Sequence, residues 1–155
     1  MSKAEPIAAT LARGALSGVA GTVVMTGFQT YVEMPITSRE ESYAPADLAR
    51  RLGIKVRRRH RRRVNYVTHF ALGAGWGLAR AAAARVGLRG QPAVGAVFGA
   101  MWPGDVAAAT ALGLEKPWRW SGRDWAIDVV DKLVLAEATG LAFDRLEARS
   151  HAAAS

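Results

Sequence analysis

The sequence predicts an all-α membrane protein: a four-transmembrane-helix bundle with a short amphipathic helix in the first loop. Three observations predict this fold. The chain of 155 residues contains long segments with almost no charge, many of its 16 glycines are spaced as in closely packed membrane helices, and its basic excess is concentrated in one loop. We expect a single membrane domain over 1–155, with helices at about 8–32, 64–85, 91–113 and 122–146 and a basic loop at 33–63.

The first helix is predicted by the longest uncharged segment. The 19 residues at 14–32, between Arg13 and Glu33, carry no charge. At about 1.5 Å per residue, such a helix nearly matches the roughly 30 Å hydrocarbon thickness of a bilayer. Pro35 is expected to end this helix. A signal peptide fits less well, because the apolar segment is longer than a signal core and lacks a small-residue cleavage pattern.

Three further segments are apolar but less strongly so. Residues 64–79 contain no Asp, Glu, Lys or Arg, and residues 90–114 contain only Asp105. The last segment, 125–143, is the least hydrophobic of them. A soluble four-helix bundle would need a polar outer face on every helix, and the first three segments offer none. The modest mean hydropathy of +0.05 includes the charged loop and many small residues, so the membrane bundle remains the favoured interpretation.

Glycine pairs separated by three residues occur in each of the first three segments. This spacing lets two helix backbones approach closely in lipid, where helix formation is enforced by backbone hydrogen bonding. The predicted helix-packing residues are Gly14, Gly18, Gly73, Gly77, Gly95 and Gly99.

The loop 33–63 contains a predicted short helix and a run of basic residues. Pro45 begins the short helix and Gly53 ends it. The basic run that follows has no aromatic residues interleaved, so as a nucleic-acid patch it would bind without sequence preference. We favour contact with anionic lipid headgroups, since the run directly precedes an apolar helix. The predicted headgroup contacts are Arg57, Arg58, Arg59, Arg61, Arg62 and Arg63.

The distribution of Lys and Arg predicts the orientation. The first loop contains ten of these residues and the 115–124 connection three, against seven at the termini and the 80–89 connection. The positive-inside rule therefore places the 33–63 loop in the cytoplasm and both termini outside. Trp118, Trp120 and Trp125 are expected at the membrane interface near the last helix, where Ser121 and Asp124 form a predicted capping box.

Ionisable residues inside the predicted helices form a hypothetical polar centre. Two interpretations remain open for it. The residues either fix the register of the helices through ion pairs with Lys132 and Arg80, which we favour, or provide a path for protons or cations. The members of this centre are His69, Asp105, Asp128, Asp131 and Lys132.

No sequence pattern points to an enzyme. The chain contains no Cys, and its three His residues are too scattered to suggest a metal site. Metalloprotease, serine-hydrolase, phosphate-loop and dinucleotide-binding motifs are also missing from the sequence. We therefore expect no catalytic residue, no cofactor and no bound metal.

The placement of glycine and aromatic residues resembles small bacterial inner-membrane proteins of the YagU-like type. The resemblance covers residues 10–146 and rests on the Gly-rich first helix ending in Glu33 and Pro35, on HFALGAGWG beginning at His69, and on similar placements in the later segments. It implies four helices in the inner membrane and carries over no catalytic residue. The long arginine run is not part of this pattern.

The expected function is that of a multi-pass inner-membrane protein with a structural or interaction role. Its partners would be the bilayer, anionic lipids and a second copy of the chain, with no specific nucleic acid. Proton or cation transport is the first alternative. A basic peripheral protein that binds nucleic acid is the second.

Overall fold

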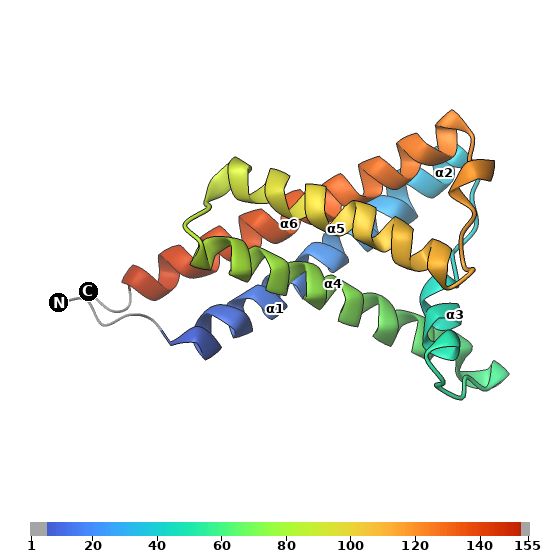
Figure 1. The fold of residues 1–155 in the computed structure, drawn as a ribbon, viewed down its shortest axis with the longest axis horizontal. Helices are drawn as coiled ribbons and strands as arrows, with labels where there is room; N and C mark the ends of the chain where they lie inside the picture. The colour runs from blue at the N-terminus through green and yellow to red at the C-terminus, as the bar shows by residue number, and fades with distance from the viewer. Residues whose placement is uncertain (1–5, 153–155) are drawn as a thin grey trace.

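The computed structural model describes residues 6–152, which form helices joined by loops (Figure 1). The predicted all-α class is confirmed, although among these residues a single helix, Ile7–Thr37, has the length and composition of a membrane span. In chain order the elements are α1 (Ile7–Phe28), the π-helical η1 (Gln29–Glu33), α2 (Met34–Thr37), α3 (Ala44–Arg51), the 3-10 helix η2 (Arg58–His60), α4 (Arg61–Arg85), α5 (Gly90–Ala111), the 3-10 helix η3 (Pro117–Arg119) and α6 (Gly122–Ala152).

The prediction that Pro35 ends the first helix is wrong. α1, η1 and α2 form one continuous helix that ends at Thr37, where Ser38 adopts a left-handed conformation. Proline inside a helix removes one backbone hydrogen bond and crowds the carbonyl four residues earlier. The π-helical turn at 29–33 ends two residues before Pro35, so the backbone just before the ring pairs residue i with i−5 instead of i−4.

The predicted end of the last helix at residue 146 is also too early. α6 continues to Ala152 because its final turns have partners elsewhere in the chain. Arg13 on α1 donates a hydrogen bond to Ser150, and Arg89, just before α5, forms an ion pair with Glu147. The other predicted bounds agree with the structure to within three residues.

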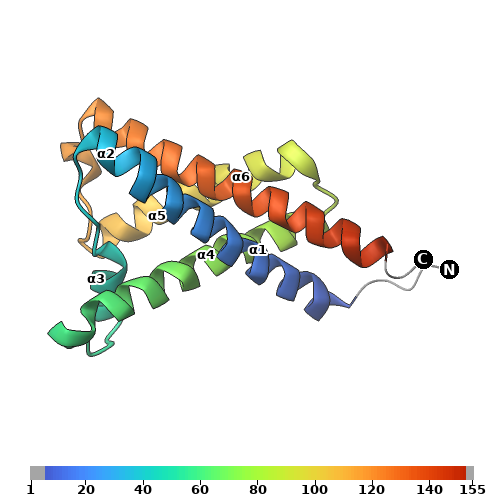
Figure 2. The same cartoon turned by 180° about the vertical axis from the view of Figure 1, so that it is seen from behind.

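The four long helices run alternately in opposite directions (Figures 1 and 2). α1 makes its most extensive contacts with α4 and α6, while α5 packs on α6 and α4, and α3 lies on α4. The loops 38–60 and 112–121 therefore lie at the same end, which we call the loop end. The start of α1, the end of α6 and the 86–89 turn lie at the opposite end, which we call the terminal end.

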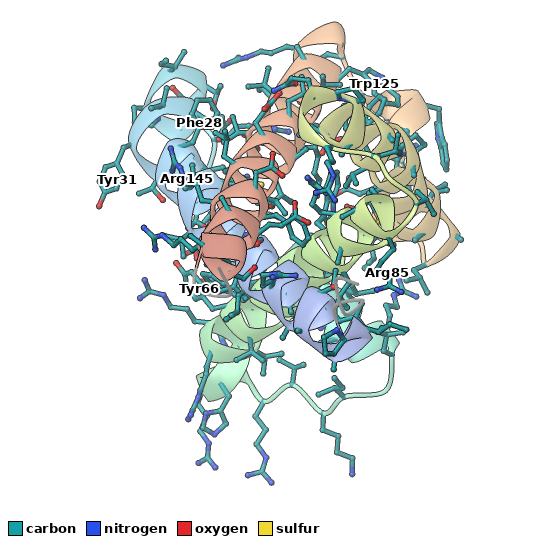
Figure 3. The ribbon with its side chains drawn as sticks, turned by 90° about the vertical axis from the view of Figure 1, so that its left-hand side faces the viewer. Phe28, Tyr31, Tyr66, Arg85, Trp125 and Arg145 are labelled. Atoms are coloured by element: carbon teal, nitrogen blue, oxygen red, sulfur yellow. The ribbon has the colours of Figure 1, made fainter. Side chains whose placement is uncertain are left out.

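The buried face of α1 is small and polar, and its exposed face is apolar. The side chains turned toward α4 and α6 are Thr10, Gly14, Ser17, Gly18, Gly21, Thr22 and Met25. The outer face carries large aliphatic side chains, with Leu16 62% exposed and Val23 57% exposed. Tyr31 points away from the bundle (Figure 3). This distribution is the reverse of a soluble helix, which buries its large apolar residues.

Candidate functional site

The structure places the predicted polar centre in the half of the bundle nearer the loop end. α4 contributes His69, α5 contributes Asp105, and α6 contributes Asp128, Asp131 and Lys132. The spacing of the three α6 residues puts them on neighbouring positions of one helix side. Each of the five has a polar partner on another helix, so the centre joins the helices to one another.

Asp105 links α5 to both α4 and α6. Its Oδ2 accepts a hydrogen bond from the Trp76 indole at 3.1 Å and lies 3.3 Å from the Lys132 ammonium. The Trp76 ring also lies beneath that ammonium, 5.9 Å away. Asp128 lies one turn before Lys132 on the same helix, but no ion pair joins the two in the described residues. That carboxylate instead accepts a hydrogen bond from the Trp102 indole at 2.7 Å.

Asp131 is the most buried carboxylate of the centre, with 8% of its surface exposed. Gln29, in the π-helical turn, donates a hydrogen bond to its Oδ2 at 2.7 Å. The other oxygen, Oδ1, is buried and has no hydrogen-bond partner within the described residues. Glu33, from the same π-helical turn, is buried as well and accepts a hydrogen bond from Thr37 at 2.7 Å.

His69 lies in the centre but has a separate partner. Its Nε2 is 3.2 Å from the Thr26 hydroxyl on α1. No hydrogen bond joins this ring to Asp105, Asp128 or Asp131 in the described structure. Among the described residues, no group of three or more His, Asp or Glu side chains lies close enough together to hold a metal ion.

Gln29 and Glu33 also belong to this centre, although the sequence pattern did not predict them there. Their positions follow from the π-helical turn, which is not recognisable from helical periodicity. The Gln29 amide was visible as a polar group in an apolar segment. Its partner on α6, 102 residues away, was not.

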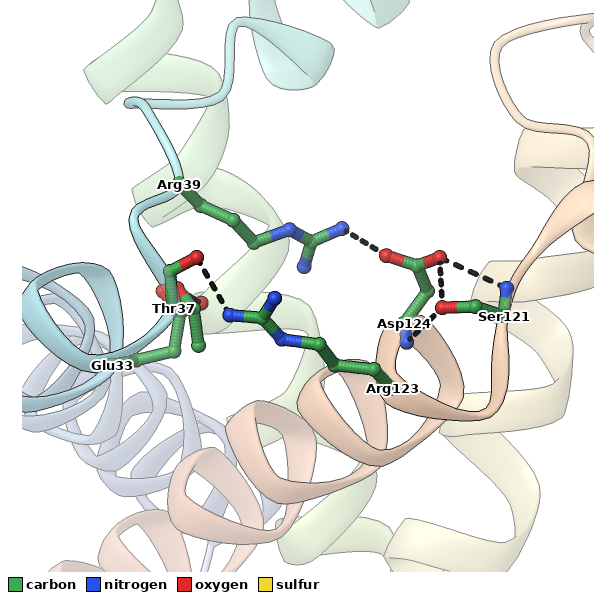
Figure 4. Close-up of polar contacts among 6 residues, drawn as sticks. All are labelled: Glu33, Thr37, Arg39, Ser121, Arg123 and Asp124. Carbon is green, nitrogen blue, oxygen red and sulfur yellow. Dashed lines mark hydrogen bonds and ion pairs between the residues drawn. The ribbon is translucent and has the colours of Figure 1, made fainter.

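A second polar network ties the loops together at the loop end (Figure 4). Arg39 forms an ion pair with Asp124 at 3.1 Å, and Arg123 donates a hydrogen bond to the Thr37 carbonyl at 2.7 Å. The predicted capping box is present, with the Asp124 carboxylate accepting from Ser121 and the Ser121 hydroxyl accepting from the Asp124 backbone. The Ser121 hydrogen bonds, aided by Arg39, lower the pKa of Asp124 below its usual value.

An ion pair between a buried arginine and a partly exposed aspartate lies toward the terminal end. Arg80 is 1% exposed, forms an ion pair with Asp144 and places its guanidinium 4.5 Å from the Phe143 ring. The predicted pairing of Arg80 with carboxylates of the polar centre is therefore wrong. Arg80 and Asp144 tie α4 to α6 separately from that centre.

The glycine pairs of α1 and α4 meet at a close crossing. A Cβ at Gly14 would lie 2.6 Å from the Gly77 carbonyl oxygen, and a Cβ at Gly18 would overlap the Gly73 carbonyl. The third predicted pair is different. Gly95 and Gly99 lie on the exposed side of α5, and no atom lies within 4 Å of a Cβ built at either. Their predicted helix packing does not occur within the described chain, because α5 packs on α4 and α6 through Ala93, Val94 and Val97.

The predicted headgroup contacts lie just before η2, in η2 and at the start of α4. Every side chain from Arg57 to Arg63 is exposed. Arg61 contacts Asp47 at 3.4 Å and lies 4.5 Å from the Tyr43 ring. This region and the polar centre are separate sites, and only the polar centre is enclosed by helices.

Comparisons with known proteins give no relative. No protein-family model, no curated protein and no solved structure matches the chain. The resemblance to YagU-like proteins stays a prediction.

Proposed function

We propose that this chain is a multi-pass protein of the bacterial inner membrane with a structural or interaction role. The observation that carries the proposal is the reversed face of α1, which buries Gly, Ser and Thr and exposes Leu and Val. In water, this apolar surface would be costly to leave uncovered. In a bilayer, lipid chains cover it, and small residues allow close helix packing.

If α1 spans a bilayer, the other long helices lie in the same bilayer. α4 and α6 pack along α1, so a bilayer that α1 spans also surrounds them, and α5 is packed on both. Their charged residues support this placement, because Asp105, Asp131 and Lys132 have partners within the bundle. Ionisable groups in membrane helices characteristically face the protein interior.

The charge at the loop end supports a cytoplasmic position for the 33–63 loop. Residues 33–63 and 115–124 at this end carry thirteen Lys and Arg residues, against six toward the terminal end among the described residues. The exposed Trp118 and Tyr31 also lie toward the loop end, as expected for aromatic residues at an interface. The outward Gly95 and Gly99 give α5 a small-residue surface at which a second copy would pack.

Extraction of the membrane fraction tests integration. We expect the full chain to stay with membranes in high salt and in alkaline carbonate, and to dissolve only in detergent. Release by salt or carbonate would overturn the proposal, since neither treatment extracts a helix that spans the bilayer.

Transport of a proton or cation is the second candidate function, and the charge of the polar centre supports it. Lys132 pairs with Asp105, which leaves Asp128, Asp131 and Glu33 with neutral hydrogen-bond donors only. Buried carboxylates without a cationic partner favour the uptake of a positive charge.

Flux measured in proteoliposomes tests this second candidate. We expect the original protein to conduct protons or cations. The flux should fall in Asp131→Asn and in His69→Ala, the second variant in the centre. Asp124→Asn is the matched control, because this carboxylate lies on the same helix but at the loop end. Flux that is absent, or equal in all four proteins, removes transport as a function.

A further inference from the structure

The net charge of the protein resides in one short segment. Residues 44–63 contain nine of the 21 Lys and Arg residues and one of the 13 acidic residues. The remainder of the chain therefore has twelve basic and twelve acidic residues. The formal charge of +8 belongs to this segment, which we call the basic arm (residues 44–63).

Most of the charge of the basic arm is open to solvent and only partly neutralised. Its single acid, Asp47, pairs with Arg50 at 3.2 Å and with Arg61 at 3.4 Å. Arg57 and Arg58 are exposed, and no ion pair involves either in the described part of the chain. The arm therefore presents a concentrated positive surface at the loop end.

The basic arm is fixed to the bundle along one side only. Ala46 and Ala49 of α3 are buried against the start of α4. Asn65, also buried, accepts a hydrogen bond from the Ala46 backbone at 3.0 Å and donates one to the Ser42 carbonyl at 3.0 Å. These contacts hold the arm against α4, while its other side is exposed to solvent.

Two aliphatic side chains project from the middle of the basic arm. Leu52 is 65% exposed and Ile54 is 53% exposed. Between them, Gly53 adopts a left-handed conformation with φ of 88° and ends α3. The arm thus combines exposed apolar side chains with flanking cations, the pattern of segments that lie at a membrane surface.

We propose that the basic arm binds the surface of an anionic bilayer, with arginines on the lipid phosphates and Leu52 and Ile54 inserted among the acyl chains. This inference rests on the proposed function, since insertion of α1 brings the arm to a membrane surface. Anionic lipid attracts clustered Lys and Arg, and the acyl layer buries the aliphatic pair. A nucleic acid would satisfy the arginines but leave Leu52 and Ile54 in water, and the arm carries no Phe, Tyr or Trp to stack on bases.

A spin label on the basic arm tests the proposal, and the absence of native Cys makes a single attachment site available. The full-length Ile54→Cys protein is labelled and reconstituted in liposomes of phosphatidylcholine with or without phosphatidylglycerol. We expect the label to become accessible to membrane-dissolved oxygen and shielded from an aqueous relaxation agent when phosphatidylglycerol is present. A label on Glu41→Cys should remain aqueous in both compositions.

Two further measurements complete the experiment: the removal of charge and a binding test with nucleic acid. Adding Arg57→Gln and Arg58→Gln to the labelled protein should abolish the phosphatidylglycerol-dependent shift. The control variant, Arg145→Gln with Arg149→Gln, removes the same charge from α6 toward the terminal end and should preserve the shift. A label that stays aqueous with phosphatidylglycerol overturns the proposal. Tight binding of mixed-sequence RNA or DNA that the Arg57 and Arg58 substitutions abolish, with no lipid-dependent shift, also overturns it in favour of nucleic acid.

Carbonate extraction of the same proteoliposomes separates this inference from the proposed function. A protein that resists extraction but shows no lipid-dependent shift is integral without a lipid-binding arm. A protein that carbonate releases but that shows the shift uses the arm without spanning the bilayer.

Discussion

At the scale of single residues, glycine has two different roles, depending on whether another backbone lies against it. Gly77 on α4 faces Gly14 and Gly18 of α1, and an added Cβ would overlap the Gly14 carbonyl. Gly75, on the same helix, has no atom within 4 Å of an added Cβ. The two positions therefore form a matched pair for testing whether the α1–α4 crossing depends on small residues.

Gly77→Ala should destabilise the protein by about 1–3 kcal/mol, because the new methyl group meets backbone atoms that cannot rotate away. Gly75→Ala should leave stability unchanged or raise it by up to about 1 kcal/mol, since alanine is the better helix former. Thermal unfolding in detergent, followed by helical circular dichroism, measures both. Equal stability of the two variants would contradict the close crossing.

The buried Arg80 guanidinium depends on Asp144 for its charge partner. Asp144→Ala should cost about 2–3 kcal/mol, because it leaves a buried positive charge unpaired while solvent at the 40%-exposed Asp144 position screens part of the loss. Glu147→Ala, which breaks the more exposed pair with Arg89, should cost no more than about 1 kcal/mol. The same unfolding measurement compares the two, and similar losses would show that the buried Arg80 guanidinium does not depend on Asp144.

At the scale of helices, the first helix is organised by its two faces and by its π-helical turn. The outer face meets lipid in the proposed function, while the turn at 29–33 directs Gln29 toward Asp131. A charge on the outer face separates the membrane interpretation from the soluble one. In water, an exposed charge is nearly neutral for stability, whereas in lipid it opposes insertion.

Val23→Asp should reduce the fraction of protein inserted in membranes, because a charge near the centre of a spanning helix costs about 2.5–3.5 kcal/mol. Val23→Leu is the matched control and should insert as well as the original chain. Quantification of the carbonate-resistant fraction measures the effect. Normal insertion of the Asp variant would mean that this face of α1 does not contact lipid.

The start of α6 should give a pH-dependent contribution to stability. The folded pKa of Asp124 is lowered, so the ionised carboxylate stabilises the capping box above the usual Asp pKa of about 3.9, and this contribution is lost as pH falls through the folded pKa. The melting temperature should therefore exceed that of Asp124→Asn by a constant margin near neutral pH, and the margin should vanish in acid. A margin that is independent of pH would exclude the carboxylate as its source.

At the scale of the whole molecule, the fold separates two ends of different charge. The loop end holds the basic arm and the Arg39–Asp124 network, and the terminal end holds the 86–89 turn. In the proposed orientation, α4 crosses the membrane between them. The lack of native Cys allows this orientation to be tested with single substitutions.

Val86→Cys should react with a membrane-impermeant maleimide added to intact cells whose outer membrane has been permeabilised. Glu41→Cys should react only after the inner membrane is opened, because the loop end is proposed to be cytoplasmic. Both positions are exposed, so burial does not block the reaction. Reaction of both from the same side would contradict a spanning α4.

Periodicity and composition predicted the helical class and the approximate helix bounds. These properties are local, because each helix satisfies its own backbone hydrogen bonds and charged residues mark its ends. The errors at Pro35 and at the end of α6 arose where a π-helical turn and contacts with distant residues extended a helix.

The sequence by itself determined that the chain is helical, that its basic charge is concentrated in one segment and that five polar residues lie within apolar helices. Only the tertiary structure decided that Gly14, Gly18, Gly73 and Gly77 pack together while Gly95 and Gly99 face outward. It likewise paired Lys132 with Asp105 and brought Gln29 to Asp131. The physical reason is that such pairings depend on the rotation and crossing of whole helices, which the sequence of one helix does not specify.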